Sequence, residues 1–331
     1  MLYSAVMKRT VSLALKFMVS GLLIWFLFRD IDVAATFERL AATDPLWLAA
    51  AMGLLLVQAA VMVVRWQGVC VAIGAPLPFL RVLQFLFIGL FFNQVLPASV
   101  GGDAFRIYKV HRFGRRLGEA INGVMLDRIA ALVAIFVLVV LTTPFLFARL
   151  GDDPARWLFP ALAIPALAGI GVLMVLDRLP SALHRWRLVR GLADLAAGTR
   201  RLFLIPANVV RVMGTAVLGH VLLSLVVYAL ARGLAVDIGF VDYLVLFPPV
   251  ILISAMPISI AGWGVREGAM VTAFAFAGVS AESALVISVM FGLLLIVIAL
   301  PGVVAWFGGD GRTAAVAETV AADALAAIEP R

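Results

Sequence analysis

The sequence predicts an all-α integral membrane protein that contains an inverted repeat. Of its 331 residues, 64% are hydrophobic and only 14% are charged, whereas a soluble domain carries about 25% charged residues. Several apolar runs reach the ~20 residues that a helix needs to cross a bilayer. Two similar motifs that contain Pro and Gly interrupt apolar runs in the two halves of the chain, and such paired interruptions are typical of secondary transporters.

Apolar stretches of spanning length alternate with shorter polar segments. We expect about six spanning helices, at residues 11–28, 46–64, 121–147, 157–176, 210–231 and 283–307. The first of these follows Lys8 and Arg9, as the apolar part of a signal peptide would, but no small-residue cleavage site comes after it. We therefore interpret 11–28 as a retained helix.

Two further apolar stretches, 79–98 and 243–260, end at the repeated motifs. The first motif reads LPASVGGDAFR and ends at Arg106, and the second reads MPISIAGWGVR and ends at Arg266. Aligned without a gap, four pairs of identical residues coincide: Pro97 with Pro257, Ser99 with Ser259, Gly102 with Gly262 and Arg106 with Arg266. Backbone freed from a helix in hydrocarbon persists only inside protein or beside a cavity. Each motif therefore predicts a broken segment in the membrane.

Basic residues predict the orientation, because loops rich in Lys and Arg stay in the cytoplasm. Segment 99–120 holds five of them and segment 177–209 holds six. If 79–98 crossed fully, segment 99–120 would lie outside. We therefore expect re-entrant segments at about 79–105 and about 243–275, entering from opposite faces, with both termini cytoplasmic. Eight full crossings with proline kinks are the alternative.

This topology divides the chain into two membrane halves. The first half comprises residues 1–150 and the second comprises 151–307, each reading helix, helix, re-entrant segment, helix. Residues 308–331 are polar and Ala-rich, which predicts a mobile cytoplasmic tail.

The adjacent charges Arg266 and Glu267 are the first candidate site. A charge at the centre of a membrane helix costs ~2.5–3.5 kcal/mol and needs a partner or water. Neighbours at i and i+1 do not face each other on a helix, so we expect one of the two to pair with the other half of the chain. The candidate partners are Arg106, Asp103, Asp127 and Arg128. Arg266 could hold a phosphate, since a guanidinium bonds two oxygens at once; a structural ion pair is the alternative.

Further polar residues interrupt the apolar stretches. Gly102 and Asp103 open a short helix that we expect to run to about His111; its N–H groups could attract an anion, or Asp103 could simply cap it. Asn93 is expected to bond backbone released by the break. His220, Ser224 and Tyr228 fall at i, i+4 and i+8 on one helix face. They could line a polar groove, or they could form interhelical hydrogen bonds.

Signals for an enzyme or a cofactor are few. The chain has a single cysteine, Cys70, and three scattered histidines, so we expect no metal and no cofactor. The basic charge balance reflects cytoplasmic loops rather than nucleic-acid binding. A membrane glycosyl- or phospho-transferase would need acidic outer-loop residues, for which the candidates are Asp30, Asp32, Asp152 and Asp153.

The two motifs, extended to Phe92–Arg106 and Ile258–Gly268, resemble a flippase-like family named for the transmembrane region of lysylphosphatidylglycerol synthase. The resemblance covers roughly residues 10–307. It implies a bacterial or archaeal inner-membrane protein that translocates or helps process lipids. The residues that match the family's motif positions are Asn93, Gly102, Asp103, Arg106, Gly262, Trp263, Arg266 and Glu267. The synthases carry a soluble aminoacyl-transfer domain after the membrane region, so we expect this chain not to make lysyl-lipid alone.

We therefore expect a lipid transporter that moves a phospholipid or lipid-linked intermediate between leaflets. The expected ligands are an anionic phospholipid, a polyprenyl phosphate or a glycolipid, whose phosphate would bind Arg266 together with Arg106. The alternatives are the lipid-linked transferase and a non-transporting scaffold for a lipid-modifying enzyme. That separate enzyme and a second copy of the chain are the candidate protein partners.

Overall fold

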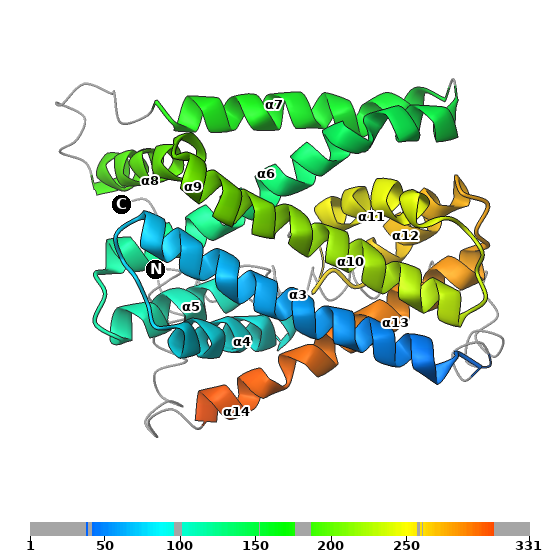
Figure 1. Ribbon diagram of the computed structural model, residues 1–331, viewed down its shortest axis with the longest axis horizontal. Helices are drawn as coiled ribbons and strands as arrows, with labels where there is room; N and C mark the ends of the chain where they lie inside the picture. Colours follow the sequence, from blue (N-terminus) through cyan, green and yellow to red (C-terminus); the bar gives the residue numbers. More distant parts are fainter. Residues whose placement is uncertain are drawn as a thin grey trace, which may run out of the picture.

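The computed structural model describes residues 38, 42–95, 101–151, 153–175, 187–256, 259 and 261–307, and in these ranges its regular secondary structure is helical (Figure 1). Four helical stretches here are long and apolar enough to cross a membrane: Pro45–Ala72, Leu117–Ala148, Pro206–Gly233 and Ala281–Phe307. The predicted all-α membrane fold is confirmed. The predicted helix 11–28 and the tail 308–331 lie outside the described residues.

The spanning elements follow the predicted order. They are α3 (Pro45–Ala72), α6 (Leu117–Leu150), α10 (Gly214–Gly233) and α13 (Ala281–Ala299). Two short elements, α9 (Pro206–Asn208) and the π-helical turn η4 (Val209–Met213), lead into α10, and α14 (Pro301–Phe307) follows α13. The predicted helix 157–176 is the shorter α7 (Leu158–Leu173), which follows a 3₁₀ turn, η1 (Pro154–Trp157).

Helix α3 illustrates how local sequence sets these boundaries. The Asp44 side chain accepts a hydrogen bond of 2.8 Å from the Leu46 N–H, and Pro45 occupies the first turn. Both features favour a helix start. The helix ends before Gly74, whose φ of +76° a residue with a side chain rarely adopts. α3 therefore continues eight residues beyond the predicted end at 64, to Ala72, which places Arg65 well inside it.

Two helix pairs fold back on themselves instead of crossing. α4 (Phe79–Val95) and α5 (Gly101–Arg112) lie side by side and run in opposite directions (Figure 1). At 1.5 Å per residue they are only about 25 and 18 Å long. α11 (Phe240–Ser254) and α12 (Val265–Ala275) form a second such pair, which opens toward the opposite end of the molecule.

These pairs overlap the predicted segments 79–105 and 243–275, and two short antiparallel helices are the arrangement expected of a re-entrant hairpin. The breaks themselves, 96–100 and 257–258, lie outside the described residues. The division into halves 1–150 and 151–307 stays a prediction.

The helices pack around two buried apolar clusters. One cluster, centred on Tyr243, Phe247 and Phe291, joins α11 and α13 to α10. The other, centred on Trp66 and Leu86, joins α3 and α4 to α6. α3 and α10 run antiparallel through the middle of the molecule and connect the two clusters (Figure 1). Each hairpin therefore has a separate core beneath it.

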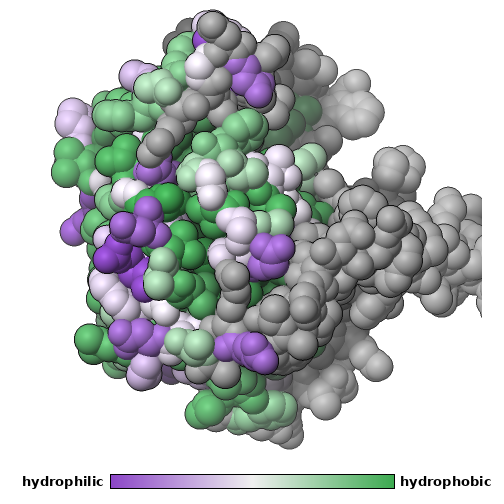
Figure 2. Space-filling model, turned by 90° about the vertical axis from the view of Figure 1, so that its right-hand side faces the viewer, coloured by the Kyte–Doolittle hydropathy of each residue, from purple (hydrophilic) through white to green (hydrophobic). Residues whose placement is uncertain are grey.

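The two ends of the molecule differ in charge. Loop 113–116 and the amphipathic helix α8 (Arg187–Leu204) lie at the end from which α4 and α5 open, on the left of Figure 1. α8 buries Leu202 and exposes Arg190 and Arg201, as a helix in a membrane interface does. Figure 2 shows the opposite end, where hydrophilic residues are scattered among hydrophobic ones.

The loop prediction for 99–120 was wrong in detail. Most of this segment is helical, because it contains α5 and the start of α6. Arg106 is 4% exposed and so belongs to the interior rather than to the basic surface. Segment 177–209 likewise contains α8, α9 and the start of η4.

Candidate functional site

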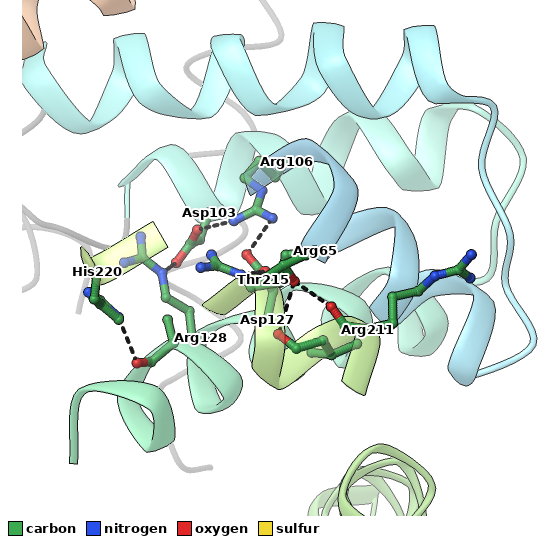
Figure 3. Close-up of polar contacts among 10 residues, drawn as sticks. Arg65, Asp103, Arg106, Asp127, Arg128, Arg211, Thr215 and His220 are labelled. Atoms are coloured by element: carbon green, nitrogen blue, oxygen red, sulfur yellow. Dashed lines mark hydrogen bonds and ion pairs between the residues drawn. The ribbon is translucent and has the colours of Figure 1, made fainter. Parts of the chain in front are cut away.

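Five charged side chains form a cluster between α3, α5 and α6 (Figure 3). Arg65 on α3 donates to Asp127 on α6 at 2.8 Å. Arg106 on α5 donates to Asp103 at 3.2 Å and to Asp127 at 2.9 Å. Arg128 on α6 donates to Asp103 at 2.6 Å. We call this set of five residues the first cluster. It ties the first hairpin to two spanning helices.

Burial explains why these charges are paired. In a medium of low polarity an isolated charge is costly, and removal of one partner from a buried pair costs about 3–5 kcal/mol. The two carboxylates are 2% and 4% exposed, and the side chains of Arg65 and Arg106 are 7% and 5% exposed. The Arg106 guanidinium also lies 3.8 Å above the ring of Trp66. These four groups hold the hairpin in place.

Arg128 differs from the other members of the first cluster. Its side chain is 42% exposed, although it is bonded to the buried Asp103. It lies eleven residues after the start of α6 at Leu117, about 16 Å along a helix. Arg128 is thus a half-exposed guanidinium within the long apolar helix α6 rather than at its end. The first cluster therefore presents one cation on its outer side.

The inner end of the first hairpin is closely packed. The Asn93 side-chain oxygen accepts a hydrogen bond of 3.0 Å from the Gly102 N–H, so the predicted role of Asn93 is confirmed. A Cβ on Gly102 would lie 2.0 Å from the Gly89 carbonyl oxygen. α5 runs from Gly101 to Arg112, as the sequence predicted, but the Asp103 carboxylate forms ion pairs in its first turn. Glycine at position 102 is thus required by contact with α4.

A second cluster lies at the inner end of the second hairpin. The Arg266 guanidinium donates to Glu267 at 2.6 Å and to the Ser288 hydroxyl at 3.2 Å. Ser288 in turn donates to Glu267 at 3.0 Å. Arg266 also lies 4.7 Å above the Trp263 ring. A Cβ on Gly292 would be 2.3 Å from the guanidinium, so α13 leaves the space that Arg266 fills.

This geometry corrects the prediction that Arg266 and Glu267 do not pair with one another. The i,i+1 rule applies to side chains that project from the body of a helix, whereas these two occupy the first turn of α12. Glu267 turns back to accept the Gly264 N–H at 2.5 Å, and the long Arg266 side chain reaches the same carboxylate. The expected partners in the other half pair with one another and with Arg65 instead.

The turn before α12 uses unusual backbone conformations. Ala261, Gly262 and Gly264 have φ values of +50°, +81° and +84°. A left-handed residue with a Cβ, such as Ala261, is disfavoured and persists only where its surroundings impose it. The Ser259 hydroxyl is buried and has no hydrogen-bond partner among the described residues. Residues 261–264 therefore form a shaped turn directly before α12.

The polar face of α10 does not form one groove. His220 makes a 3.0 Å contact with the carbonyl of Ala131, three residues after Arg128 on α6, and so borders the first cluster (Figure 3). Ser224 donates to the His220 carbonyl within its own helix. Tyr228 packs edge-on against the rings of Trp47 and Tyr243. The His220 contact is therefore an interhelical hydrogen bond, which was the alternative to a polar groove.

Sequence reasoning did not select four residues that complete these clusters. Arg65 and Trp66 directly follow the apolar run 46–64, so the sequence places both residues at a helix end. Ser288 and Gly292 lie one turn apart in the most apolar part of α13. A small or polar pair at i and i+4 in such a helix is a usable signal for a close interhelical contact.

The described residues contain no group of three or more His, Cys, Asp or Glu side chains that could hold a metal ion. Of the four outer acidic residues, Asp153 is exposed, whereas Asp30, Asp32 and Asp152 lie outside the described residues. The structure thus assigns no metal centre to the part it describes.

A comparison with protein families gives one match. The family model described as lysylphosphatidylglycerol synthase TM region matches residues 13–302, which includes both hairpins and both clusters. Among curated proteins, none matches this chain.

Proposed function

This chain belongs to the lysylphosphatidylglycerol synthase transmembrane-region family, and on that premise we propose that it moves an amphipathic lipid between the leaflets of a bacterial or archaeal inner membrane. It is a membrane protein of a family related to lipid handling. Transport itself, rather than lipid synthesis by this chain, is the proposal. We place both termini and the basic end in the cytoplasm.

The observation that carries the proposal is the pair of opposed hairpins. One helix of each hairpin, α5 or α12, carries buried charges of a cluster in an otherwise apolar interior. The two hairpins open toward opposite ends of the molecule. Interrupted helices that place polar groups at mid-depth between two repeats are the usual way in which secondary transporters form a substrate site. A lipid headgroup needs such groups to replace its lost hydration.

Arg128 is the proposed first contact for the headgroup phosphate. It is the most exposed guanidinium of the first cluster, and phosphate is a good bidentate partner for Arg. Binding there would compete for the ion pair between Arg128 and Asp103, which lies on the hairpin. Headgroup binding would therefore loosen α5 from α6.

We propose a different role in transport for Arg106 and Arg266. Both are bonded to carboxylates and nearly inaccessible in this conformation, so they would meet a headgroup only after the hairpins shift. Here they hold the inner ends of α5 and α12. The lipid tail would remain in the bilayer while the headgroup passes between the hairpins.

Lipid translocation in proteoliposomes tests the proposal. Purified protein, Arg128→Gln and the control Arg232→Gln are compared, with fluorescent phosphatidylglycerol, aminoacylated phosphatidylglycerol and a polyprenyl phosphate. Arg232 pairs with Asp237 at the opposite end, so its loss removes a cation without touching the first cluster. We expect the wild type and the control to accelerate the flipping of one lipid. We expect Arg128→Gln to be slower by about tenfold or more, since one hydrogen bond to a charged group is lost.

The outcomes separate the alternatives. If well-folded protein accelerates no lipid, the transport proposal fails. Turnover of a lipid-linked donor that depends on divalent metal would favour the transferase. If Arg128→Gln flips lipid at the wild-type rate, the headgroup does not use Arg128.

A further inference from the structure

An open apolar groove of about 730 Å³ lies between α4 and the α13–α14 segment. It has the size of pockets that bind small organic ligands. Its lining is apolar except for Gln84: Leu80, Leu83 and Phe87 from α4, and Val297, Leu300, Pro301, Val304 and Ala305 from α13–α14. Leu80 and Val304 are 73% and 74% exposed, so the groove faces the surroundings of the protein.

Two features shape the groove: the close approach of α14 to α4, and the interruption between α13 and α14. A Cβ on Gly302 would lie 2.1 Å from the Phe87 carbonyl oxygen, so only glycine allows α14 to lie so close to α4. Pro301 begins α14 directly before this contact, after a one-residue interruption at Leu300, and α14 continues from the end of α13 (Figure 1). The two features leave a trough along the side of α4.

A cation, Arg81, lies beside the groove and is bonded to its one polar lining residue, Gln84. The Gln84 amide donates to the Ala305 carbonyl at 3.2 Å and so links the two walls. Arg81 donates to the Gln84 oxygen at 3.0 Å and lies 5.5 Å from the ring of Phe113. Arg81 is exposed, and a guanidinium carries five N–H donors, so donors remain for an oxyanion. It lies in the first turn of α4, at the end that carries the basic loop 113–116.

We propose that this groove binds an anionic phospholipid, with one acyl chain along the apolar lining and the phosphate at Arg81. A free phosphate would have no use for the apolar wall, and a neutral lipid would leave the cation unused. A second cation, Lys109, lies 4.6 Å from the ring of Trp306, next to Ala305 of the groove wall, and adds to the positive potential.

This lipid site is separate from the proposed transport path. Leu83 and Phe87 lie on one face of α4, whereas Gly89 and Asn93, which contact α5, lie on the opposite face because of the 3.6-residue period. A lipid in the groove would brace α14 against the first hairpin. The proposal rests on the membrane location of the chain and not on the flippase activity.

Native mass spectrometry of delipidated protein in detergent tests the site. The probes are dioleoyl-phosphatidylglycerol and dioleoyl-phosphatidylcholine in equal amounts, which share their acyl chains and differ in net charge. We expect the wild type to retain phosphatidylglycerol with a preference of about fivefold, the effect of one basic residue near a membrane surface. In Arg81→Gln the preference should fall to about twofold or less, because Lys109 would then be the remaining nearby cation named here.

Three further variants make the result specific. Arg232→Gln, at the opposite end, should keep the preference, and Arg81→Lys should keep part of it. Leu83→Trp, which fills the groove, should lower the occupancy of both lipids. An unchanged preference in Arg81→Gln, or equal binding of both lipids by the wild type as annular lipid only, would overturn the proposal. Since no transport is measured, failure of the flippase proposal leaves these outcomes unaffected.

Discussion

Buried guanidinium groups determine what single substitutions do to this molecule. Arg106 and Arg266 each satisfy their charge with a carboxylate in the same hairpin and with the face of a Trp ring. Cation–π contacts of desolvated groups contribute about 2 kcal/mol. Each Arg is therefore fixed by both a carboxylate and a Trp ring. Loss of Arg266 would leave the Glu267 carboxylate without a cationic partner, whereas loss of Arg106 would leave Asp103 and Asp127 paired with Arg128 and Arg65.

The second cluster offers a direct test of the cost of an unpaired carboxylate. We expect Arg266→Ala to lower the free energy of unfolding by about 3–5 kcal/mol, because Glu267 would remain buried with only neutral donors. The double variant Arg266→Met with Glu267→Gln should recover most of the loss, since it removes both charges at similar volume. Thermal unfolding in detergent, followed by far-UV circular dichroism, measures both. If the single and double variants lose the same free energy of unfolding, the unpaired Glu267 charge is not the cause of the destabilisation.

At the scale of the element, the packing around α4 depends on two positions where only glycine fits. Gly102 contacts the backbone of Gly89 and the side chain of Asn93, and Gly302 contacts the backbone of Phe87. These contacts allow α5 and α14 to approach α4 on its two opposite faces. α4 is thus packed between α5, which follows it in the chain, and α14, which lies far later in the sequence. Its position is set by backbone contacts and not only by apolar burial.

Substitution at Gly102 tests the first of these contacts. In Gly102→Ala the new Cβ would have to displace backbone, so we expect a loss of about 1–3 kcal/mol, the usual cost of overpacking. The matched control is Gly118→Ala in the first turn of α6, where no atom lies within 4 Å and alanine should favour the helix slightly. Denaturant unfolding in detergent compares the two. A Gly102→Ala protein as stable as the control would contradict the packing described here.

At the scale of the whole molecule, the hairpins decide which loops share a side of the membrane. The Arg115 side chain donates to the Pro76 carbonyl, so the loops before α4 and after α5 lie at the same end. Asp237, which is 90% exposed, lies at the other end. Eight full crossings would instead place the loops around Pro76 and Arg112 on opposite sides.

Cysteine labelling can establish this topology, because Cys70 is the chain's one cysteine and is buried. In a Cys70→Ala background, Pro76→Cys and Arg112→Cys should be labelled from the same side by a membrane-impermeant maleimide. Asp237→Cys should be labelled from the other side. Opposite labelling of positions 76 and 112 would exclude the first hairpin. Lysed cells provide the control for total reactivity.

The sequence by itself determined the class of the protein and the two segments that contain pairs of short helices. Composition and run length establish a membrane protein, because apolar side chains need no distant partner to favour a bilayer. The Pro and Gly positions in the two motifs act locally on the backbone, so the helix pairs, the start of α5 and a bond between Asn93 and nearby backbone could be predicted.

Only the tertiary structure decided which charges pair. The partner of Arg266 depends on a side chain turning back at a helix start and on the space above Gly292 on α13. Arg65 and Ser288 find their partners on other helices: Arg65 on α3 pairs with Asp127 on α6, and Ser288 on α13 bonds Glu267 on α12. An ion pair is a relation between positions in space, and sequence spacing specifies such a relation only within a helix turn.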